Sequence, residues 1–459
     1  MIDNILGIDL GTSSVKLVYF DGKDIIKSRE KYDSPTPDGW WRAVCRAAKT
    51  LDLSNIRAVG LSSQVGTYVV NGEESIGWSE PIGNEELEDI LERFSREDFL
   101  REISMPHPRI ISYPLPRLSY IKKHYKNAKN VCMPKDILCE RLTGNCVSDI
   151  FSWRGLANLE NGSYSKRMLN ELLLNDLTLP KLASPSDEAG RVSETAHLQT
   201  GIPVGTPVYI GCNDFFSGLL GMGICESGDA FDITGTSEHM GVLRNSIPLD
   251  DGGLVCGPYF FENVHYGVTA SSGSSFDLAL ELYELSKIDA DKCLEGRPPV
   301  FLPYLCGERA PIWDSNARGV FFGIEKGTDK EALAYAVSEG VAFSIYHIYE
   351  CMGKPNIKSI TAAGGAGSDP VLNRIKASLF GIPVKVSAEK DCSALGAVIC
   401  AALGHGEYSD LKSAIRDNCA YAETVEPDSV LGEKLKKRFE IYKNLYPALR
   451  DSFKLLNSK

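Results

Sequence analysis

The sequence predicts an α/β protein of two domains, and three observations support this. The chain has 459 residues, more than a single hydrophobic core usually organises. Near the N-terminus, the hydrophobic pattern gives three short strands, then a helix, then a buried strand, an order typical of α/β layers. Two similar glycine turns, one in each half of the chain, each follow a strand-like segment that contains an aspartate.

The two glycine turns are nearly the same in sequence: Gly11-Thr12-Ser13 after Asp9, and Gly235-Thr236-Ser237 after Asp232. Glycine lets the backbone turn tightly and approach a ligand, while threonine and serine add hydroxyl and amide donors. Successive N–H groups in such a turn form a concave anion site. One turn alone is more often an ordinary hairpin. A pair at matching strand ends favours a phosphate chain held from both sides in a cleft.

The other elements follow from hydrophobic spacing and from turn residues. We expect strands over residues 4–9, 15–20, 24–28, 56–61, 208–211, 360–363 and 383–386. We expect helices over residues 40–51, 330–351, 369–380 and 394–403, and a mostly helical, charge-rich region over 84–129. The second strand–turn pattern begins at Asp229, so we place the boundary after residue 228, between domains 1–228 and 229–459.

Charge and cysteine content argue against several classes of protein. A formal net charge of −12 disfavours nucleic acid or an anionic membrane as the main partner. The 13 cysteines are scattered without a Cys-x-x-Cys pair, which favours reduced thiols and a cytoplasmic location. The first residues lead directly into a strand pattern and no apolar run reaches the length of a membrane span, so we expect neither a signal peptide nor a membrane helix.

A third glycine-rich segment, residues 362–368, lies between a predicted strand and a predicted helix. Such a segment lets a flat ring or a phosphate lie against bare backbone at a helix N-terminus. A plain strand-to-helix connection explains this segment equally well when it is taken alone. The sequence has neither the P-loop pattern nor the dinucleotide fingerprint, which lowers the support for those two folds.

Asp214 stands at the end of a predicted buried strand, among glycines. A carboxylate there could accept the proton of a sugar hydroxyl while that oxygen attacks a γ-phosphate. Aspartate is also a good N-cap, so capping the following helix is the alternative role. Asn213 could serve as the cap instead.

Taken with the charged and aromatic segment 307–319, these motifs resemble the FGGY family of carbohydrate kinases, most closely its xylulokinase-like members. The resemblance covers nearly the whole chain. It rests on ordered motifs at residues 7–13, 134–144, 201–208, 211–223, 235–237, 307–319, 364–366 and 394–397.

The resemblance implies two ribonuclease-H-like domains of the actin and hexokinase type, with an ATP–sugar cleft between them. It implies that Asp214 is the catalytic base and that Asp9 lies near Mg²⁺. The N-terminal domain would bind the sugar, through Gln64, Val65 and Asp214, and the C-terminal domain the nucleotide. The residues expected to contact ATP are Gly11, Thr12, Ser13, Gly235, Thr236 and Ser237 at the phosphates, and Gly364, Gly365, Ala366 and Asn373 at the adenosine. Lys16 is expected mainly to cover the strand surface, and the protein is expected to form a homodimer.

The chain departs from the family pattern mostly at the sugar. The family histidine after the glutamine is absent from residues 63–67, and residues 78–82 keep only Trp78 of the family's Trp-x-Asp-x-Arg. A pocket that loses such polar groups cannot bind the same pattern of hydroxyls. The resemblance implies a small sugar or polyol as the acceptor, with a ketopentose such as xylulose as the first candidate, and the missing histidine counts against xylulose. The alternatives are an actin- or chaperone-like ATPase and a degenerate kinase that acts as a regulator.

Overall fold

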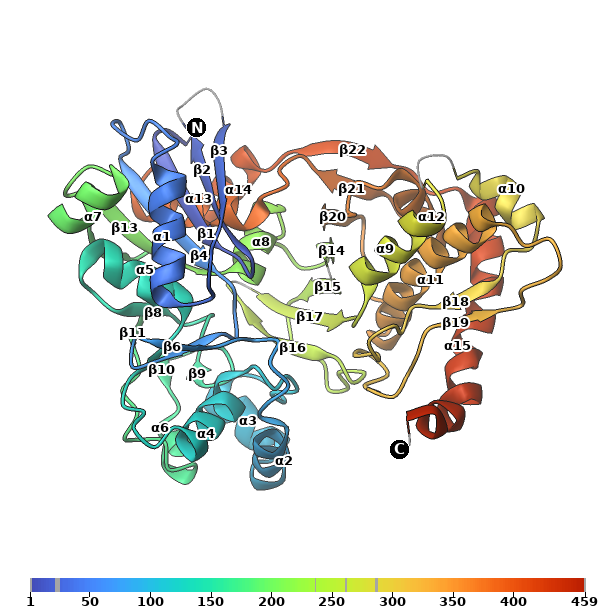
Figure 1. Cartoon of the computed structure of the whole chain (residues 1–459), viewed down its shortest axis with the longest axis horizontal. Coiled ribbons are helices and arrows are strands. Elements are labelled where there is room, and N and C mark those ends of the chain that lie inside the picture. Colours follow the sequence, from blue (N-terminus) through green and yellow to red (C-terminus); the bar gives the residue numbers. More distant parts are fainter. Residues whose placement is uncertain (1, 21–24, 236, 261, 285–287, 458–459) are drawn as a thin grey trace. The chain divides into compact units, whose positions relative to one another are not determined.

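The computed structural model describes residues 2–20, 25–235, 237–260, 262–284 and 288–457 (Figure 1). The chain forms two compact units. Unit 1 contains residues 1–225, 257–259 and 391–419, and unit 2 contains residues 226–256, 260–390 and 420–459. Residues 257–259 and 391–419 return to unit 1, so the chain does not divide into 1–228 and 229–459 as expected.

Unit 1 is built on a six-stranded sheet in the order β12-β13-β4-β1-β2-β3. The strands β1, β4 and β13 run parallel, whereas β2, β3 and β12 join antiparallel to their neighbours. The bounds are β1 (Ile5–Leu10), β2 (Ser14–Phe20), β3 (Ile25–Lys31), β4 (Ala58–Ser63), β12 (Glu188–Arg191) and β13 (Pro207–Asn213). The predicted order of three strands, a helix and a strand is confirmed, with α1 (Pro37–Ala48) as the helix.

Unit 2 repeats this plan in its sheet, whose order is β16-β17-β15-β14-β20-β21-β22. Here β14, β20 and β21 run parallel, and β15, β17 and β22 join antiparallel. The bounds are β14 (Ala230–Thr234), β15 (Glu238–Arg244), β16 (Val255–Tyr259), β17 (Glu262–Val268), β20 (Ile360–Gly364), β21 (Val384–Ser387) and β22 (Tyr421–Val425). Strand β14 therefore corresponds to β1, β15 to β2, and β20 to β4. Each glycine turn closes the hairpin at the start of its sheet.

The remaining elements are helices and short strands around these sheets. In unit 1 they are α2 (Asn84–Arg93), α3 (Arg96–Ile103), α4 (Pro114–His124), α5 (Pro134–Thr143), α6 (Lys166–Glu171), α7 (Glu194–Thr200), α8 (Asp214–Gly221), α13 (Cys392–Gly404), α14 (Leu411–Asn418), β5 (Tyr68–Val70), β6 (Glu74–Ile76), β7 (Val131–Cys132), β8 (Val147–Asp149), β9 (Ala157–Asn158), β10 (Ser163–Tyr164) and β11 (Lys181–Ala183). In unit 2 they are α9 (Ser272–Leu282), α10 (Ala290–Glu295), α11 (Lys330–Cys351), α12 (Pro370–Phe380), α15 (Ser429–Asn457), β18 (Val300–Leu302) and β19 (Val320–Phe322). The helix expected over 330–351 is confirmed as α11 with the same bounds. Residue 24, expected in a strand, lies outside the described residues.

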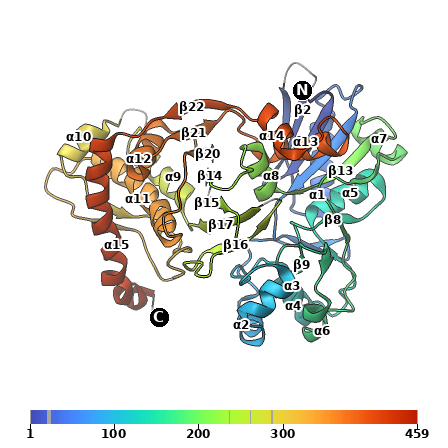
Figure 2. The ribbon, with the colours of Figure 1, turned by 180° about the vertical axis from the view of Figure 1, so that it is seen from behind.

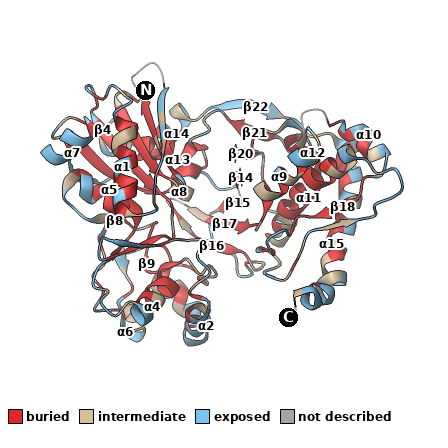
Figure 3. Ribbon diagram, in the orientation of Figure 1, coloured by how far each residue is buried: buried red, intermediate tan, exposed pale blue. Residues whose placement is uncertain are grey.

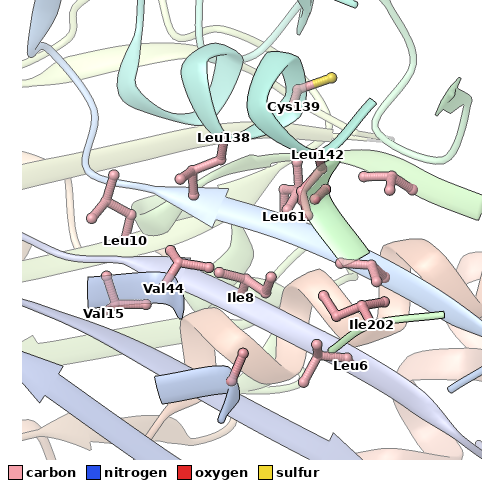
Figure 4. Packing of buried hydrophobic residues seen from close by; sticks show 14 of the residues in the cluster. Leu6, Ile8, Leu10, Val15, Val44, Leu61, Leu138, Cys139, Leu142 and Ile202 are labelled. Atoms are coloured by element: carbon pink, nitrogen blue, oxygen red, sulfur yellow. The ribbon is translucent and has the colours of Figure 1, made fainter. Parts of the chain in front are cut away.

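The core of unit 1 lies between its sheet and the helices on one face. Leu6, Ile8 and Leu10 alternate along β1, as a strand with one face in a core requires, and they pack with Val44 of α1 and Leu138 of α5 (Figure 4). Burial follows the same layers in both units, where central strands and the inner faces of helices are buried (Figure 3). Burial of apolar side chains supplies most of the stability of such layers.

Helix α13 comes late in the chain but covers the sheet of unit 1, where it packs on β1, β4 and α8 (Figure 2). Glycine makes this close packing possible. A Cβ at Gly396 would lie 1.9 Å from the Ser217 carbonyl oxygen, and one at Gly221 would lie 2.1 Å from that of Cys392. Helix α13, which was expected over 394–403, therefore holds α8 against the sheet. Asp214 is the first residue of α8, so its position is fixed as well.

Candidate active site

The two candidate carboxylates of unit 1, Asp9 and Asp214, lie at the carboxyl ends of parallel strands. Strands β1, β4 and β13 run parallel, with Asp9 opposite Ser62 and Ser62 opposite Cys212. Asp214 follows β13 directly as the first residue of α8. Because neighbouring strands lie about 4.8 Å apart, the backbones of Asp9 and Asp214 are separated by roughly two strand spacings. The fold thus brings together two carboxylates that are 205 positions apart in the sequence.

Asp214 is not the helix cap. Asn213 caps α8, since its side-chain oxygen accepts a hydrogen bond from the Phe216 amide at 2.9 Å. The half-buried Asp214 carboxylate accepts from the Phe215 amide, also at 2.9 Å. Burial, and then the charge of Asp9, raise the pKa of Asp214 to about 7. A carboxyl group whose pKa lies near neutrality is suited to accept a proton during catalysis.

Asp9 is buried, with 2% of its surface exposed, and its two oxygens differ in their surroundings. Oδ1 accepts a 3.0 Å hydrogen bond from the Ser62 hydroxyl, and Oδ2 lies 3.9 Å from the Lys16 ammonium. Burial raises the pKa of Asp9, and Lys16 opposes that shift. Lys16 also lies 3.5 Å from Asp391, so it does more than cover the strand: it joins two acidic side chains.

The first glycine turn is exposed, and the side chains of Tyr32 and Trp78 hydrogen-bond to it. The Gly11 amide donates to the Ser14 carbonyl at 3.0 Å, while Thr12 and Ser13 face outward. The Tyr32 hydroxyl bonds to the Gly11 carbonyl at 3.3 Å and to the Thr12 carbonyl. The Trp78 indole N–H donates to the Thr12 hydroxyl oxygen at 3.2 Å. The retained tryptophan of the altered motif therefore contacts the phosphate turn.

Gln64 and Val65 follow β4 at the same edge but differ in exposure. The Gln64 amide N–H donates to the Leu10 carbonyl at 2.8 Å, and its side chain is 5% exposed. Its Oε1 accepts from the Thr67 hydroxyl at 3.3 Å, so this side chain supports the loop from within. Val65 is half-buried, and its backbone N–H is hydrogen-bonded to the Asp214 carboxylate, which lowers the pKa of that group. A substrate contact by either residue stays a prediction.

Arg117 is a functional candidate that the motifs did not reveal. Its side chain is fully buried beneath the loop that carries Trp78, and Nη2 donates to the carbonyls of Trp78 at 3.2 Å and Glu80 at 2.9 Å. The Glu80 carboxylate in turn accepts from the Gly77 amide at 2.5 Å. The available signal was a charged residue flanked by apolar residues in Leu115-Pro116-Arg117-Leu118. Glu80 thus folds back onto its own loop.

The second glycine turn closes the β14–β15 hairpin of unit 2. Gly235 is exposed, Ser237 is half-buried, and the Gly235 amide donates to the Ser237 carbonyl at 2.9 Å. Thr236, the third expected phosphate contact of this turn, lies outside the described residues.

The glycine loop between β20 and α12 lies next to this hairpin, because Thr234 of β14 pairs with Gly364 of β20. Gly364 and Gly365 are exposed and Ala366 is half-buried. Gly364 has a φ of +95°, and a Cβ there would lie 2.4 Å from the Thr234 carbonyl oxygen, so the position requires glycine. Asn373 is 1% exposed and donates to the Gly367 carbonyl at 2.9 Å. Asn373 therefore holds the loop from inside, and its contact with adenosine stays a prediction.

The unusual segment 307–319 is organised by Glu308. Its carboxylate accepts from the amides of Ala270 at 2.7 Å and Arg309 at 2.8 Å, and burial raises its pKa to about 8. Asp314 accepts from the Tyr446 hydroxyl at 2.9 Å. The segment is thus a tied loop rather than a generic surface loop.

No group of three or more histidine, cysteine, aspartate or glutamate side chains within the described residues is arranged to hold a metal ion. Among the helices in the described part of the chain, none is long and apolar enough to cross a membrane.

Comparison with known proteins agrees with this fold. The chain is 25% identical to "Xylulose kinase" of Staphylococcus xylosus, with 96% of this chain and 99% of that protein aligned. Among solved structures, a gluconate kinase from Lactobacillus acidophilus superposes with a TM-score of 0.86 at 24% identity, covering 99% of each chain. Plasmodium falciparum glycerol kinase, solved with ADP, superposes with a TM-score of 0.84 at 19% identity over 98% of each chain. These structural likenesses show the fold.

Family models account for both halves of the chain. The N-terminal domain model of the FGGY family of carbohydrate kinases matches residues 4–221, and the C-terminal domain model matches residues 233–405. With both models matched in order, the chain belongs to the FGGY family of carbohydrate kinases.

Proposed function

We propose that this ATP-dependent sugar kinase phosphorylates a hydroxyl of a small sugar or polyol, with Asp214 as the general base. The observation that carries the proposal is the state of the Asp214 carboxylate. Asn213 caps α8, so Asp214 does not, and burial together with the charge of Asp9 raises the pKa of Asp214 to about 7. A ketopentose such as xylulose is the first candidate acceptor, because the relative from Staphylococcus xylosus carries the name xylulose kinase.

In the proposed step, the Asp214 carboxylate accepts the proton of the sugar hydroxyl. The freed oxygen forms a bond to the γ-phosphorus of ATP. The bond from that phosphorus to the bridging oxygen breaks, and ADP leaves with the electron pair. The Val65 amide, hydrogen-bonded to the same carboxylate, orients the base. The half-buried position of Asp214 limits its contact with water, which would otherwise compete as an acceptor.

Asp9 is the residue that would hold Mg²⁺. Magnesium prefers carboxylate oxygens, and it usually combines one or two of them with phosphate oxygens and water. Asp9 presents one oxygen bonded only to a serine hydroxyl and one at 3.9 Å from Lys16, which fits that donor set. When bound, the ion would neutralise charge that develops on the transferred phosphoryl group.

We assign acceptor binding to unit 1 and nucleotide binding to unit 2. The turn at Gly11, Thr12 and Ser13 and the turn at Gly235, Thr236 and Ser237 would bind the phosphate chain through their threonine and serine hydroxyls and backbone N–H groups, since the Gly11 and Gly235 N–H groups are used within the hairpins. The exposed backbone of Gly364, Gly365 and Ala366 would contact the adenosine, with Asn373 fixing that loop.

An ADP-release assay with a panel of ketopentoses, hexuloses, polyols and sugar acids tests this proposal. We expect ADP release to depend on one class of acceptor and to be lost in Asp214→Asn. ADP release that no acceptor stimulates would instead indicate an ATPase of the actin or chaperone type. Binding of sugar or nucleotide without any ADP release would indicate a degenerate kinase.

A further inference from the structure

Beneath the second glycine turn lies a charged cluster that the proposed chemistry does not use: Asp232, Glu238 and Lys376, all fully buried. The Lys376 ammonium donates to the Asp232 carboxylate, to Glu238 Oε1 at 2.6 Å and to the Thr234 hydroxyl oxygen at 3.3 Å. The Thr234 hydroxyl donates to the same Glu238 oxygen at 3.0 Å. Burying charged side chains costs desolvation free energy. A protein with apolar side chains of similar volume in their place is often as stable.

The cluster is placed where it joins the two ends of the turn. Thr234 ends β14 and Glu238 begins β15, and the two are paired across the hairpin. Asp232 lies two residues before Thr234, so both side chains are on the same face of the strand. Lys376 reaches this face from α12. The bonds from Lys376 to Thr234 and Glu238 therefore close the hairpin immediately below residues 235–237.

The same lysine connects the hairpin to the glycine loop. Lys376 lies three residues after Asn373 on α12, which places both on one side of the helix. Asn373 fixes the loop through the Gly367 carbonyl, and Lys376 fixes the hairpin. Helix α12 thus contacts both the hairpin that carries exposed Gly235 and the loop that carries exposed Gly364 and Gly365.

The charges of the cluster balance. Burial, and then the charge of Glu238, raise the pKa of Asp232, which favours its neutral form beside the Glu238–Lys376 pair. The Glu238 carboxylate and the Lys376 ammonium then form a neutral pair. Removing both charges together is therefore a fair test, because it leaves no unpaired charge buried.

We propose that Thr234, Glu238 and Lys376 are positioning residues for the nucleotide, which set Gly235 and Ser237 against the glycine loop 364–366. This rests on the proposed function, which assigns nucleotide binding to unit 2. These side chains do not touch ATP. They act by fixing backbone N–H groups in the geometry that phosphate oxygens need. The protein therefore loses little conformational entropy when the nucleotide binds.

The experiment measures the affinity of the full chain for ADP in Glu238→Gln/Lys376→Met. We expect the Kd for ADP to rise about tenfold, as the loss of a charge-assisted hydrogen-bond network predicts, with kcat at saturating ATP unchanged within threefold. The matched control is Glu339→Gln/Arg438→Met, which removes an ion pair of unit 2 between buried Glu339 and half-buried Arg438, with Nε to Oε1 at 2.6 Å, that joins α11 to α15. The control should keep the wild-type Kd. An unchanged Kd in the first variant, or an equal rise in both, overturns the proposal.

Two further variants keep the test decisive. Thr234→Val keeps both charges and removes only the bridging hydroxyl, so it reports even if the double variant fails to fold. We expect about a threefold rise in the Kd for ADP, restored by Thr234→Ser; no rise counts against the proposal. Gly235→Asp places a carboxylate on the exposed turn and should abolish ADP binding. If Gly235→Asp binds ADP normally, the nucleotide assignment to unit 2 fails. If it loses ADP while the Glu238, Lys376 and Thr234 variants do not, only the positioning role fails.

Discussion

The two glycine turns have similar sequences and hairpins but opposite electrostatic surroundings. In unit 1, Asp9 lies 3.9 Å from Lys16, whose side chain is 27% exposed. The negative charge of Asp9 helps to raise the pKa of Asp214. In unit 2, Asp232 is in contact with Lys376, and neither side chain is exposed. The first turn is therefore accompanied by the half-buried carboxylate of Asp214, whereas the carboxyl groups beside the second turn are buried with the Lys376 ammonium.

This difference indicates how one folding plan can supply two functions. Both sheets begin with an antiparallel hairpin beside a parallel strand, so both present a turn of backbone N–H groups at the same place. The side chains below the turn then decide its role. Carboxylates with only a distant cation suit proton transfer and metal binding. A buried cluster whose charges compensate one another suits a rigid turn that binds an anion. The predictions below test this division, from the largest expected effect to the smallest.

Asp214→Asn should lower kcat by about 10²–10⁴-fold, the usual contribution of a positioned general base. The amide keeps the size of the side chain but cannot accept the hydroxyl proton. Steady-state ADP release with the best acceptor measures the loss. Asp329→Asn is the matched control, because asparagine caps a helix as well as aspartate and Asp329 caps α11. A variant at Asp214 that retains a tenth of the wild-type kcat would remove this residue from the mechanism.

Lys376→Met should lower the free energy of unfolding by about 3–5 kcal/mol, since it strands a buried carboxylate. Lys16→Met should lower it by only about 0–1 kcal/mol, because Lys16 is partly exposed. Urea denaturation of both variants, followed by circular dichroism, gives the comparison. An equal loss of unfolding free energy in the two variants would mean that the ion pairs of Lys376 and Lys16 do not differ in their contribution to stability.

The kcat/KM for the acceptor should rise about tenfold per pH unit below pH 7 and level off above it, because the ionised form of Asp214 is the active base. Stability should change in the opposite direction. The folded state binds the Asp214 proton more tightly than the unfolded state, so this contribution is lost as the pH rises from about 4 to about 7. Denaturation of wild type and Asp214→Asn at pH 5 and pH 8 tests this. Identical pH dependence in the two proteins would contradict it.

Trp78→Phe should have the smallest effect, a rise of about fivefold in the KM for ATP, from the loss of one hydrogen bond to Thr12 worth about 1 kcal/mol. The first turn would be less well fixed, while kcat would hold. A change in kcat with an unchanged KM would instead place the indole near the reacting atoms.

Sequence alone predicted the parts of this account that depend on local pattern. The hairpins around both turns, the α11 helix and the position of Asp214 after a buried strand all follow from hydrophobic period and from glycine. Long-range contacts were not available in that way. That Asn213 rather than Asp214 caps α8 was left open, because both residues are good caps. That Lys376 lies below Glu238, 138 positions away, depends on the packing of α12 on the sheet and has no local signal.

The most direct test of the division between the two turns compares Asp9→Asn with Glu238→Gln/Lys376→Met in two measurements, kcat at saturating ATP and the Kd for ADP without Mg²⁺. We predict that Asp9→Asn lowers kcat by about 10²-fold and keeps the Kd, whereas the double variant raises the Kd about tenfold and keeps kcat within threefold. If both variants change the same quantity, the two turns do not have separate roles and the account is wrong.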